Sequence, residues 1–148
     1  MALRISTVVL AAALGVALQS GGAAASTDRV IGYWETQNRG AIVEFGPCGT
    51  HVCGRMVWLR EPRDATGAPK RDAEGRPLCG ISLVTGLERA RSGRWEDGKI
   101  YDPRSGKHYS AEVEVTEEGT LRVRGYALAR AFGRSQIWQR AGGDRGGC

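Results

Sequence analysis

The sequence lacks most of the features that mark membrane-spanning, nucleic-acid-binding or nucleotide-binding proteins. Beyond its N-terminal segment it has no apolar run long enough to cross a membrane, and its basic residues form no continuous block. Arginines alternate with acidic residues, so the formal net charge of +5 describes a solvated surface better than a nucleic-acid-binding one. The glycines show no phosphate-binding spacing. We therefore expect no nucleic-acid partner and no cofactor.

Residues suited to catalysis are also scarce. The chain has two histidines, His51 in a predicted turn and His108 on the outer face of a predicted hairpin. Neither has a nucleophile and an acid at a motif spacing. Glu112 and Glu114 have arginine partners in the predicted sheet, whereas Glu44 is harder to place. The sequence favours a protein without enzymatic activity and predicts no catalytic residue. A hydrolase assembled around Glu44 or a histidine is the alternative.

One long apolar run is present, at the N-terminus. Arg4 precedes an apolar stretch, and small residues follow it as far as Ala25. This order is typical of a secretory signal peptide that is cleaved after Ala25, and an uncleaved membrane anchor is the alternative. We predict a signal peptide over 1–25 and a single domain over 26–148. That domain would be periplasmic or secreted, with no membrane span after cleavage.

Four cysteines follow the predicted signal peptide. Disulfides are the default state of cysteines in an exported protein. Cys48 and Cys53 flank a predicted hairpin turn and are expected to pair with each other. The alternative is a metal site of Cys48, His51 and Cys53, but the paired spacings of a zinc site are missing, so no metal is expected. Cys79 and Cys148 either pair with each other or leave Cys148 free.

Short runs of alternating apolar and polar residues recur along the domain, and no long segment carries a helical apolar stripe. This pattern predicts an all-β fold, a small antiparallel up-and-down barrel of about eight strands. The stretch 61–77 is polar, with three prolines and two glycines, and is predicted to be a long surface loop. The expected strands lie near 31–36, 40–48, 52–60, 81–89, 95–102, 107–116, 120–127 and 134–140.

Two hairpins can be placed in register from their turn residues. The loop Glu117-Glu118-Gly119 ends on a glycine that suits a left-handed conformation, and a second turn runs from Asp102 to Lys107. In these registers one face of the shared strand is apolar, and the other pairs opposite charges across the strands. The predicted partners are Val113 with Val123, Glu114 with Arg122, Glu112 with Arg124, Ile100 with Tyr109 and Gly98 with Ala111.

A third hairpin is predicted around the first two cysteines. If Cys48 lies directly opposite Cys53, then Phe45 faces Met56 and Val43 faces Trp58. Phe45, Met56, Val43 and Trp58 would then form one apolar face. Because the loop closed by this disulfide is small, the bond is expected to fix the register more than to stabilise the whole domain.

The two ends of the domain carry residues that could close a barrel. Gly32-Tyr33-Trp34 opens the first predicted strand, and Trp138-Gln139-Arg140 closes the last one. Neighbouring first and last strands would let the Arg140 guanidinium stack on the Trp34 indole and seal one end. This arrangement resembles that of lipocalins and calycins, in which a Gly-x-Trp motif meets an arginine of the last strand. The alternative is a core tryptophan and an unrelated surface arginine.

Six motifs follow one another along the domain: Gly32-Tyr33-Trp34, Cys53-Gly54-Arg55-Met56-Val57-Trp58-Leu59, Gly98-Lys99-Ile100-Tyr101-Asp102-Pro103, Ser105-Gly106-Lys107, Leu121-Arg122-Val123-Arg124-Gly125-Tyr126 and Trp138-Gln139-Arg140. In this order they resemble an exported bacterial family known only as domain of unknown function 2147. The resemblance implies a small lipocalin-like barrel in the periplasm, with no established activity and no agreed catalytic residues. Cys48 and Cys53 match the family's pattern, whereas Cys79 and Cys148 depart from it.

Large apolar side chains are the leading candidates for binding. We expect Phe45, Met56, Trp58 and Tyr109 to line the barrel, which can hold one small ligand or be packed solid. The first hypothesis is a periplasmic module that binds a small apolar or amphipathic ligand near these residues. The second is a non-enzymatic envelope interaction module with a packed core. Its binding surface would be the 61–77 loop or an exposed sheet face, and its protein partner is unknown.

Overall fold

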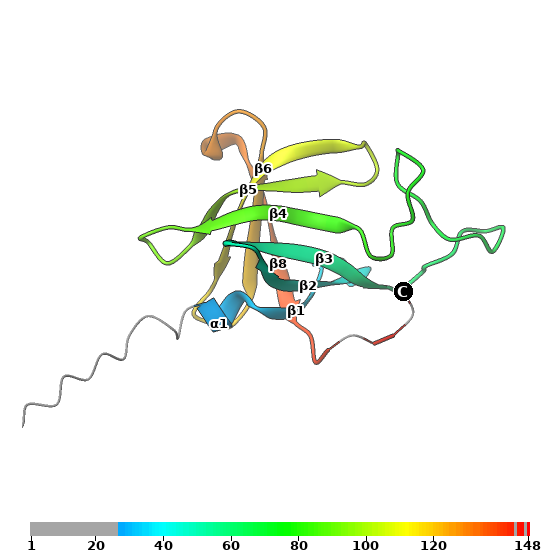
Figure 1. Cartoon of the computed structure of the whole chain (residues 1–148), viewed down its shortest axis with the longest axis horizontal. Coiled ribbons are helices and arrows are strands. Elements are labelled where there is room, and N and C mark those ends of the chain that lie inside the picture. Colours follow the sequence, from blue (N-terminus) through cyan, green and yellow to red (C-terminus); the bar gives the residue numbers. More distant parts are fainter. Residues whose placement is uncertain (1–26, 144, 147) are drawn as a thin grey trace, which may run out of the picture.

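The computed structural model is a closed antiparallel barrel of eight strands in sequence order (Figure 1). The structure describes residues 27–143, 145, 146 and 148, so the predicted signal peptide lies outside the described residues. The elements are α1 (Thr27–Val30), β1 (Gly32–Glu35), β2 (Ala41–Cys48), β3 (His51–Leu59), β4 (Ser82–Arg89), β5 (Trp95–Asp102), β6 (Lys107–Val115), β7 (Leu121–Tyr126), the 3-10 helix η1 (Arg130–Phe132) and β8 (Arg134–Arg140).

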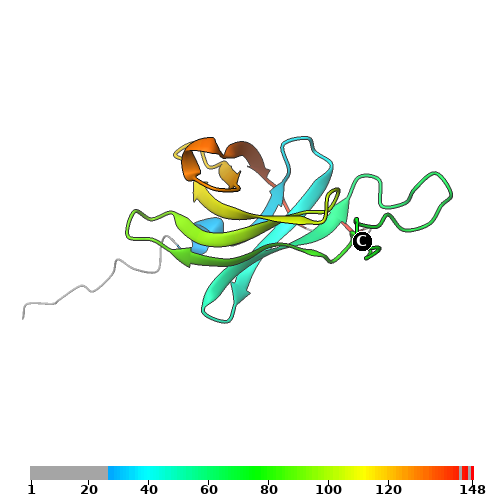
Figure 2. The same ribbon diagram turned by 90° about the horizontal axis from the view of Figure 1, so that it is seen from above.

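The pairing of the first strand with the last closes the sheet. β1 pairs with β2 along one edge and with β8 along the other, where Trp34 lies opposite Arg140. Seen from above, the strands cross at steep angles around one interior, as a tightly twisted barrel requires (Figure 2). The all-β barrel prediction is confirmed, and every predicted strand is present with ends that differ by no more than one residue. Among the described residues, no helix is long and apolar enough to cross a membrane.

Two of the three predicted hairpin registers are confirmed. In the β6–β7 hairpin Glu114 lies opposite Arg122 and forms an ion pair with it. Gly119 in the connecting loop has a φ of 79°, the left-handed value that this loop needs. The β5–β6 hairpin pairs Ile100 with Tyr109, as predicted. The turn residues and the alternation of apolar and charged residues together predicted the register of these strands.

The register predicted for the β2–β3 hairpin is wrong. Cys48 lies opposite His51 rather than Cys53, so the turn contains only Gly49 and Thr50. Gly49 has a φ of 66°, which suits a two-residue hairpin turn. Cys48 and Cys53 are diagonal neighbours on one face, with their Cα atoms 5.8 Å apart, and this separation still permits a disulfide.

A bulge in the same hairpin moves Trp58 out of the predicted inner face. The register shifts between Ile42 and Val43, so that Val43 lies opposite Met56 and Ile42 lies opposite Trp58. An extra residue in one strand reverses which side chains face inward beyond it. Trp58 therefore lies on the outer face together with Ile42. The prediction that Trp58 pairs with Val43 on the inner face is wrong.

The C-terminal segment returns along the outer face of β1 and β3, close to the start of the long β3–β4 loop (Figure 1). The Ala141 amide donates to the Tyr33 carbonyl at 2.9 Å. Arg145 then forms an ion pair with Glu35 at 2.9 Å, and its guanidinium lies 5.0 Å from the centre of the Trp58 ring. These contacts explain why Trp58 is partly buried although it lies outside the barrel.

Side chains from α1 and from every strand fill the barrel interior. Trp34 and Trp138 are 0% and 2% exposed, and Phe45 packs edge-on against Trp138 with ring centres 6.2 Å apart. Burial of this apolar surface is the main favourable contribution to folding. The central cluster comprises Val30, Trp34, Ala41, Val43, Phe45, Val52, Met56, Leu83, Val84, Leu87, Trp95, Val113, Leu121, Val123 and Trp138.

Candidate functional site

The four residues expected to line a ligand site are not brought together. Phe45 and Met56 are 1% and 6% exposed and belong to the packed core. Tyr109 is only partly buried and lies opposite Ile100, and Trp58 lies on the outer face. The core around Phe45 has little spare room, because a Cβ added at Gly54 would come within 3.1 Å of the Phe45 ring.

Arg140 covers the end of the barrel next to α1. Its guanidinium carbon lies 3.9 Å from the centre of the Trp34 ring, and its two terminal nitrogens donate to the carbonyls of Ile31, at 2.8 Å, and Arg29. The Trp34 indole donates in turn to the Val30 carbonyl at 2.8 Å. Burial first, and then the charge of Arg29, lower the pKa of Arg140. This arrangement is a structural closure, since Arg140 and the Trp34 indole both donate hydrogen bonds to backbone carbonyls.

A shallow depression of about 360 Å³ lies on the barrel wall. Its lining is mixed, with the ion pair between Arg55 and Glu44 at 3.2 Å on one side and Cys53 on the other. A smaller hollow of about 190 Å³ lies beside Gln37, Asn38 and Gln136. Neither of these two hollows is lined by the core aromatics.

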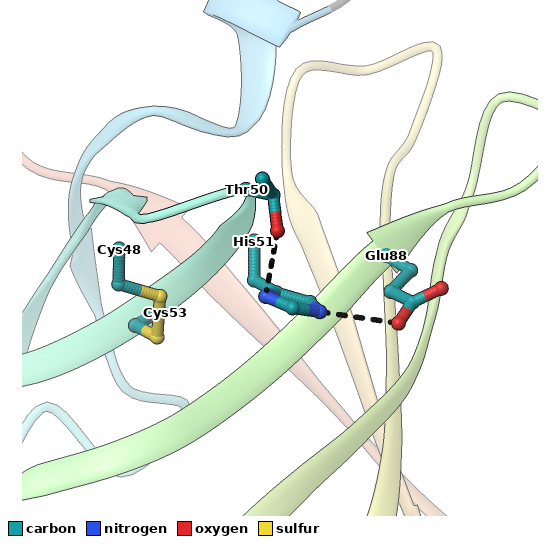
Figure 3. The surroundings of a disulfide bond; sticks show 5 residues. All are labelled: Cys48, Thr50, His51, Cys53 and Glu88. Carbon is teal, nitrogen blue, oxygen red and sulfur yellow. Dashed lines mark hydrogen bonds and ion pairs between the residues drawn. A yellow bond between two sulfur atoms is a disulfide. The ribbon is translucent and has the colours of Figure 1, made fainter.

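In the turn at the cysteines, His51 has a hydroxyl on one side and a carboxylate on the other (Figure 3). His51 Nε2 lies 3.1 Å from a Glu88 carboxylate oxygen, and the Thr50 hydroxyl lies 3.3 Å from His51 Nδ1. The imidazole extends away from the Cys48–Cys53 disulfide towards β4. None of Thr50, His51 and Glu88 lines either hollow, and the Glu88 side chain is 64% exposed. The hydrogen bond between His51 and Glu88 joins β3 to β4 at the surface.

The metal alternative for the same turn requires free thiolates. Cys48 and Cys53 are instead joined to each other, and Cys79 is joined to Cys148 across 69 residues of sequence. The described residues hold no group of three metal-ligating side chains. Both cysteine pairs therefore act as covalent links in this structure.

The β3–β4 loop is polar and contains a tandem repeat. Arg-Asp-Ala-x-Gly-x-Pro occurs at 63–69, here named the first turn, and again at 71–77, the second turn. In each turn the arginine donates to the glycine carbonyl, at 2.8 Å for Arg63 and 2.7 Å for Arg71. Each turn also closes with a bridge between its arginine and its proline. Two copies of one sequence thus form two copies of one structure.

The aspartate is the centre of each turn. Asp64 Oδ1 accepts hydrogen bonds from the Thr66 and Ala68 amides at 2.8 and 3.1 Å. Asp72 Oδ1 accepts the equivalent bonds from the Glu74 and Arg76 amides at 2.9 and 2.8 Å. Short-range bonds of this kind hold a turn without help from the barrel.

Only the second turn docks on the barrel. Asp72 is 8% exposed, and its second carboxylate oxygen accepts hydrogen bonds from the Tyr101 hydroxyl at 2.9 Å and from Arg76 Nε at 2.8 Å. Tyr101 lies on the outer face of β5, where its ring contacts His108 on β6 at 4.8 Å between centres. Burial raises the pKa of Asp72, but hydrogen bonds from Arg76, Tyr101 and Glu74 outweigh it and lower the pKa to about 2.

The first turn projects into solvent, and all of its residues are exposed. It forms the far tip of the loop that extends beyond the strands in both views (Figures 1 and 2). Its aspartate stays charged, because hydrogen bonds from the Thr66 hydroxyl and amide lower the pKa of Asp64. The repeat was missed at the level of sequence, although its period of eight residues was the signal that could have revealed it.

The barrel and its Trp34–Arg140 closure define the class of this protein, a lipocalin-like barrel of eight antiparallel strands. The chain belongs to the family described as "Uncharacterized protein conserved in bacteria (DUF2147)", which it matches over residues 32–140. This confirms the family resemblance noted in the sequence. A comparison with curated proteins finds no match.

Among solved structures, the chain is similar to protein HP1028 from the human pathogen Helicobacter pylori, which is described as belonging to the lipocalin family. The two chains are 20% identical, with a TM-score of 0.60, over 75% of this chain and 82% of that chain. At this level of identity, the similarity concerns the fold alone.

Proposed function

We propose that the protein is an extracytoplasmic, non-enzymatic interaction module that binds a protein partner through the first turn of its β3–β4 loop. The observation that carries this proposal is the filled interior, in which Trp34, Phe45 and Trp138 occupy the space that a carrier would leave for its ligand. A packed barrel leaves the outer surface as the place where binding can occur. Location outside the cytoplasm rests on the signal-like N-terminus and agrees with the two disulfides.

The first turn has the properties of a preorganised binding element. It projects from the barrel, yet its own hydrogen bonds and the docked second turn beside it hold it in one shape. Order in the free state lowers the conformational entropy lost on binding. The exposed Arg63 and Asp64 side chains offer a partner both signs of charge.

Replacement of 64–68 by glycine and serine residues of equal length tests the proposal. The variant should lose partner capture in a crosslinking pull-down from the cell envelope, with no change in the thermal unfolding midpoint, because these residues are all exposed. The matched control replaces Glu117 and Glu118, which lie in another exposed turn, with the same residue types. Unchanged capture by the first variant, or equal loss in the control, would count against the first turn as the binding element.

Binding of a small apolar or amphipathic ligand is the second candidate, favoured by the lipocalin-like fold and by the partly buried Tyr109 opposite Ile100. This role would require the core near Phe45 to open. Native mass spectrometry of protein taken from the periplasm distinguishes the candidates. A bound small molecule that a Tyr109→Ala variant loses would establish the carrier, whereas a ligand-free mass supports the interaction module.

A further inference from the structure

The β7–β8 connection, residues 127–133, holds two large apolar side chains in solvent. Leu128 is 95% exposed and Phe132 is 85% exposed, whereas Ile137, the next most exposed large apolar residue among those described, is 38% exposed. In both views the connection lies well apart from the long β3–β4 loop (Figures 1 and 2). It is thus a separate surface from the one proposed above to bind a partner.

Their exposure does not come from a loose loop. Arg130, between the two apolar residues, forms ion pairs with Glu96 at 3.0 Å and Glu112 at 3.3 Å on the outer face of the barrel. Both carboxylates are well buried, with side chains 14% and 12% exposed. The Arg130 carbonyl also accepts a hydrogen bond from Arg124 Nε at 3.1 Å. The barrel therefore fixes the middle of the connection while leaving Leu128 and Phe132 in water.

The small apolar area of Leu128 and Phe132, here named the apolar tip, favours a bilayer surface over a protein as its partner. A stable protein interface buries roughly 800 Å² on each side, whereas a phenylalanine buries only about 150–250 Å². One phenylalanine and one leucine on a projecting connection supply only a small part of that area. They suffice for the boundary between headgroups and acyl chains of a bilayer, into which isolated apolar side chains partition when basic residues flank them.

The flanking charge fits an anionic surface. Arg134 follows two residues after Phe132, is exposed, and has no ion-pair partner among the described residues. The chain as a whole carries a formal net charge of +5. A free arginine beside an apolar tip is attracted to lipid phosphates and to the negative potential of an anionic leaflet.

We propose that residues 127–133 form a membrane-surface anchor, in which Leu128 and Phe132 enter the interface of an anionic phospholipid bilayer and Arg134 contacts its phosphates. Arg130 is the positioning residue, because it ties the connection to Glu96 and Glu112. The binding is weak and reversible, as expected for two apolar side chains and one free cation. It does not depend on the first turn of the β3–β4 loop, so this proposal can fail while the proposed function stands.

Cosedimentation of the protein from residue 26 onward with vesicles tests the anchor. Vesicles of phosphatidylglycerol and phosphatidylethanolamine are compared with neutral phosphatidylcholine vesicles. The double variant Leu128→Ser/Phe132→Ser should lower the partition coefficient on anionic vesicles about tenfold or more. The variant Arg134→Gln should reduce the preference for anionic over neutral vesicles about fivefold.

The matched control is Ala127→Ser/Ala131→Ser, which changes two exposed residues of the same connection without removing a large apolar group. It should bind vesicles as the unmodified protein does. Equal binding by the Leu128/Phe132 variant, or no binding of the unmodified protein to anionic vesicles, would overturn the proposal. A dimer in analytical ultracentrifugation that the Leu128/Phe132 variant abolishes would reassign the tip to contact between copies of this chain, and would overturn it as well.

Discussion

Removal of the two disulfides should have unequal effects on stability. Cys79 and Cys148 are 69 residues apart in sequence, whereas Cys48 and Cys53 are only 5 apart. In the chain-entropy description, a cross-link stabilises the fold by restricting the unfolded chain, and the effect grows with the logarithm of the loop length. The long loop then contributes about 4 kcal/mol to the free energy of unfolding and the short loop about 2 kcal/mol. The β2–β3 hairpin should also keep its strand pairing when its disulfide is removed, because eight residue pairs hold its register.

The double variants Cys79→Ser/Cys148→Ser and Cys48→Ser/Cys53→Ser allow a direct comparison by urea unfolding, with linear extrapolation to zero denaturant. Loss of the long-range pair should cost about 2 kcal/mol more than loss of the hairpin pair. It should also increase quenching of tryptophan fluorescence by iodide, because Arg145 would leave the Trp58 ring when the C-terminal segment detaches. Equal losses of stability, or a greater loss for the hairpin pair, would refute the entropic reasoning.

Two further predictions concern packing and pH. Gly98→Ala should cost roughly 1–3 kcal/mol in urea unfolding, because the added Cβ would lie 2.6 Å from Leu87 Cδ2. Gly46→Ala, which has open space around it, is the control, and similar losses in both would contradict the packing argument. The second turn should stay docked above about pH 4 and be released as the pH falls through about 2, since folding lowers the pKa of Asp72 to about 2. Hydrogen exchange at the Arg76 amide should show the release, and Asp72→Asn should remove this pH dependence; protection that does not change with pH would argue against it.

Much of the barrel topology could be predicted because its strands alternate between apolar residues on one face and polar or charged residues on the other. The Glu114–Arg122 pair on one face and the Val113–Val123 pair on the other leave a single acceptable register for β6 and β7. The β2–β3 hairpin has a weaker pattern, and its register was taken from the cysteines. Because diagonal neighbours can also form a disulfide, that assumption placed the register two residues away from the true one.

The candidate surfaces were harder to predict than the fold. Trp58 was predicted to face inward because a bulge has no reliable sequence signal. The bulge in the β2–β3 hairpin is what moves Trp58 to the outer face. Strand periodicity places Tyr101 on the outer face and does not predict its burial. Tyr101 is buried because Asp72, from the distant β3–β4 loop, docks against it. The exposure of Phe132 likewise depends on the ion pairs of Arg130 with two strands far away in sequence. Local patterns specify the strands, whereas these contacts arise only when the barrel is assembled.

The Cys79–Cys148 link closes residues 79–148, just under half of the 148-residue chain, into a covalent ring that contains β4 to β8. A protease that cuts an exposed connection within this ring, such as 127–133, leaves both fragments attached until a reductant is added. In an oxidising compartment a nicked molecule therefore remains one molecule, and its strands can re-form the closed sheet without having to meet again by diffusion.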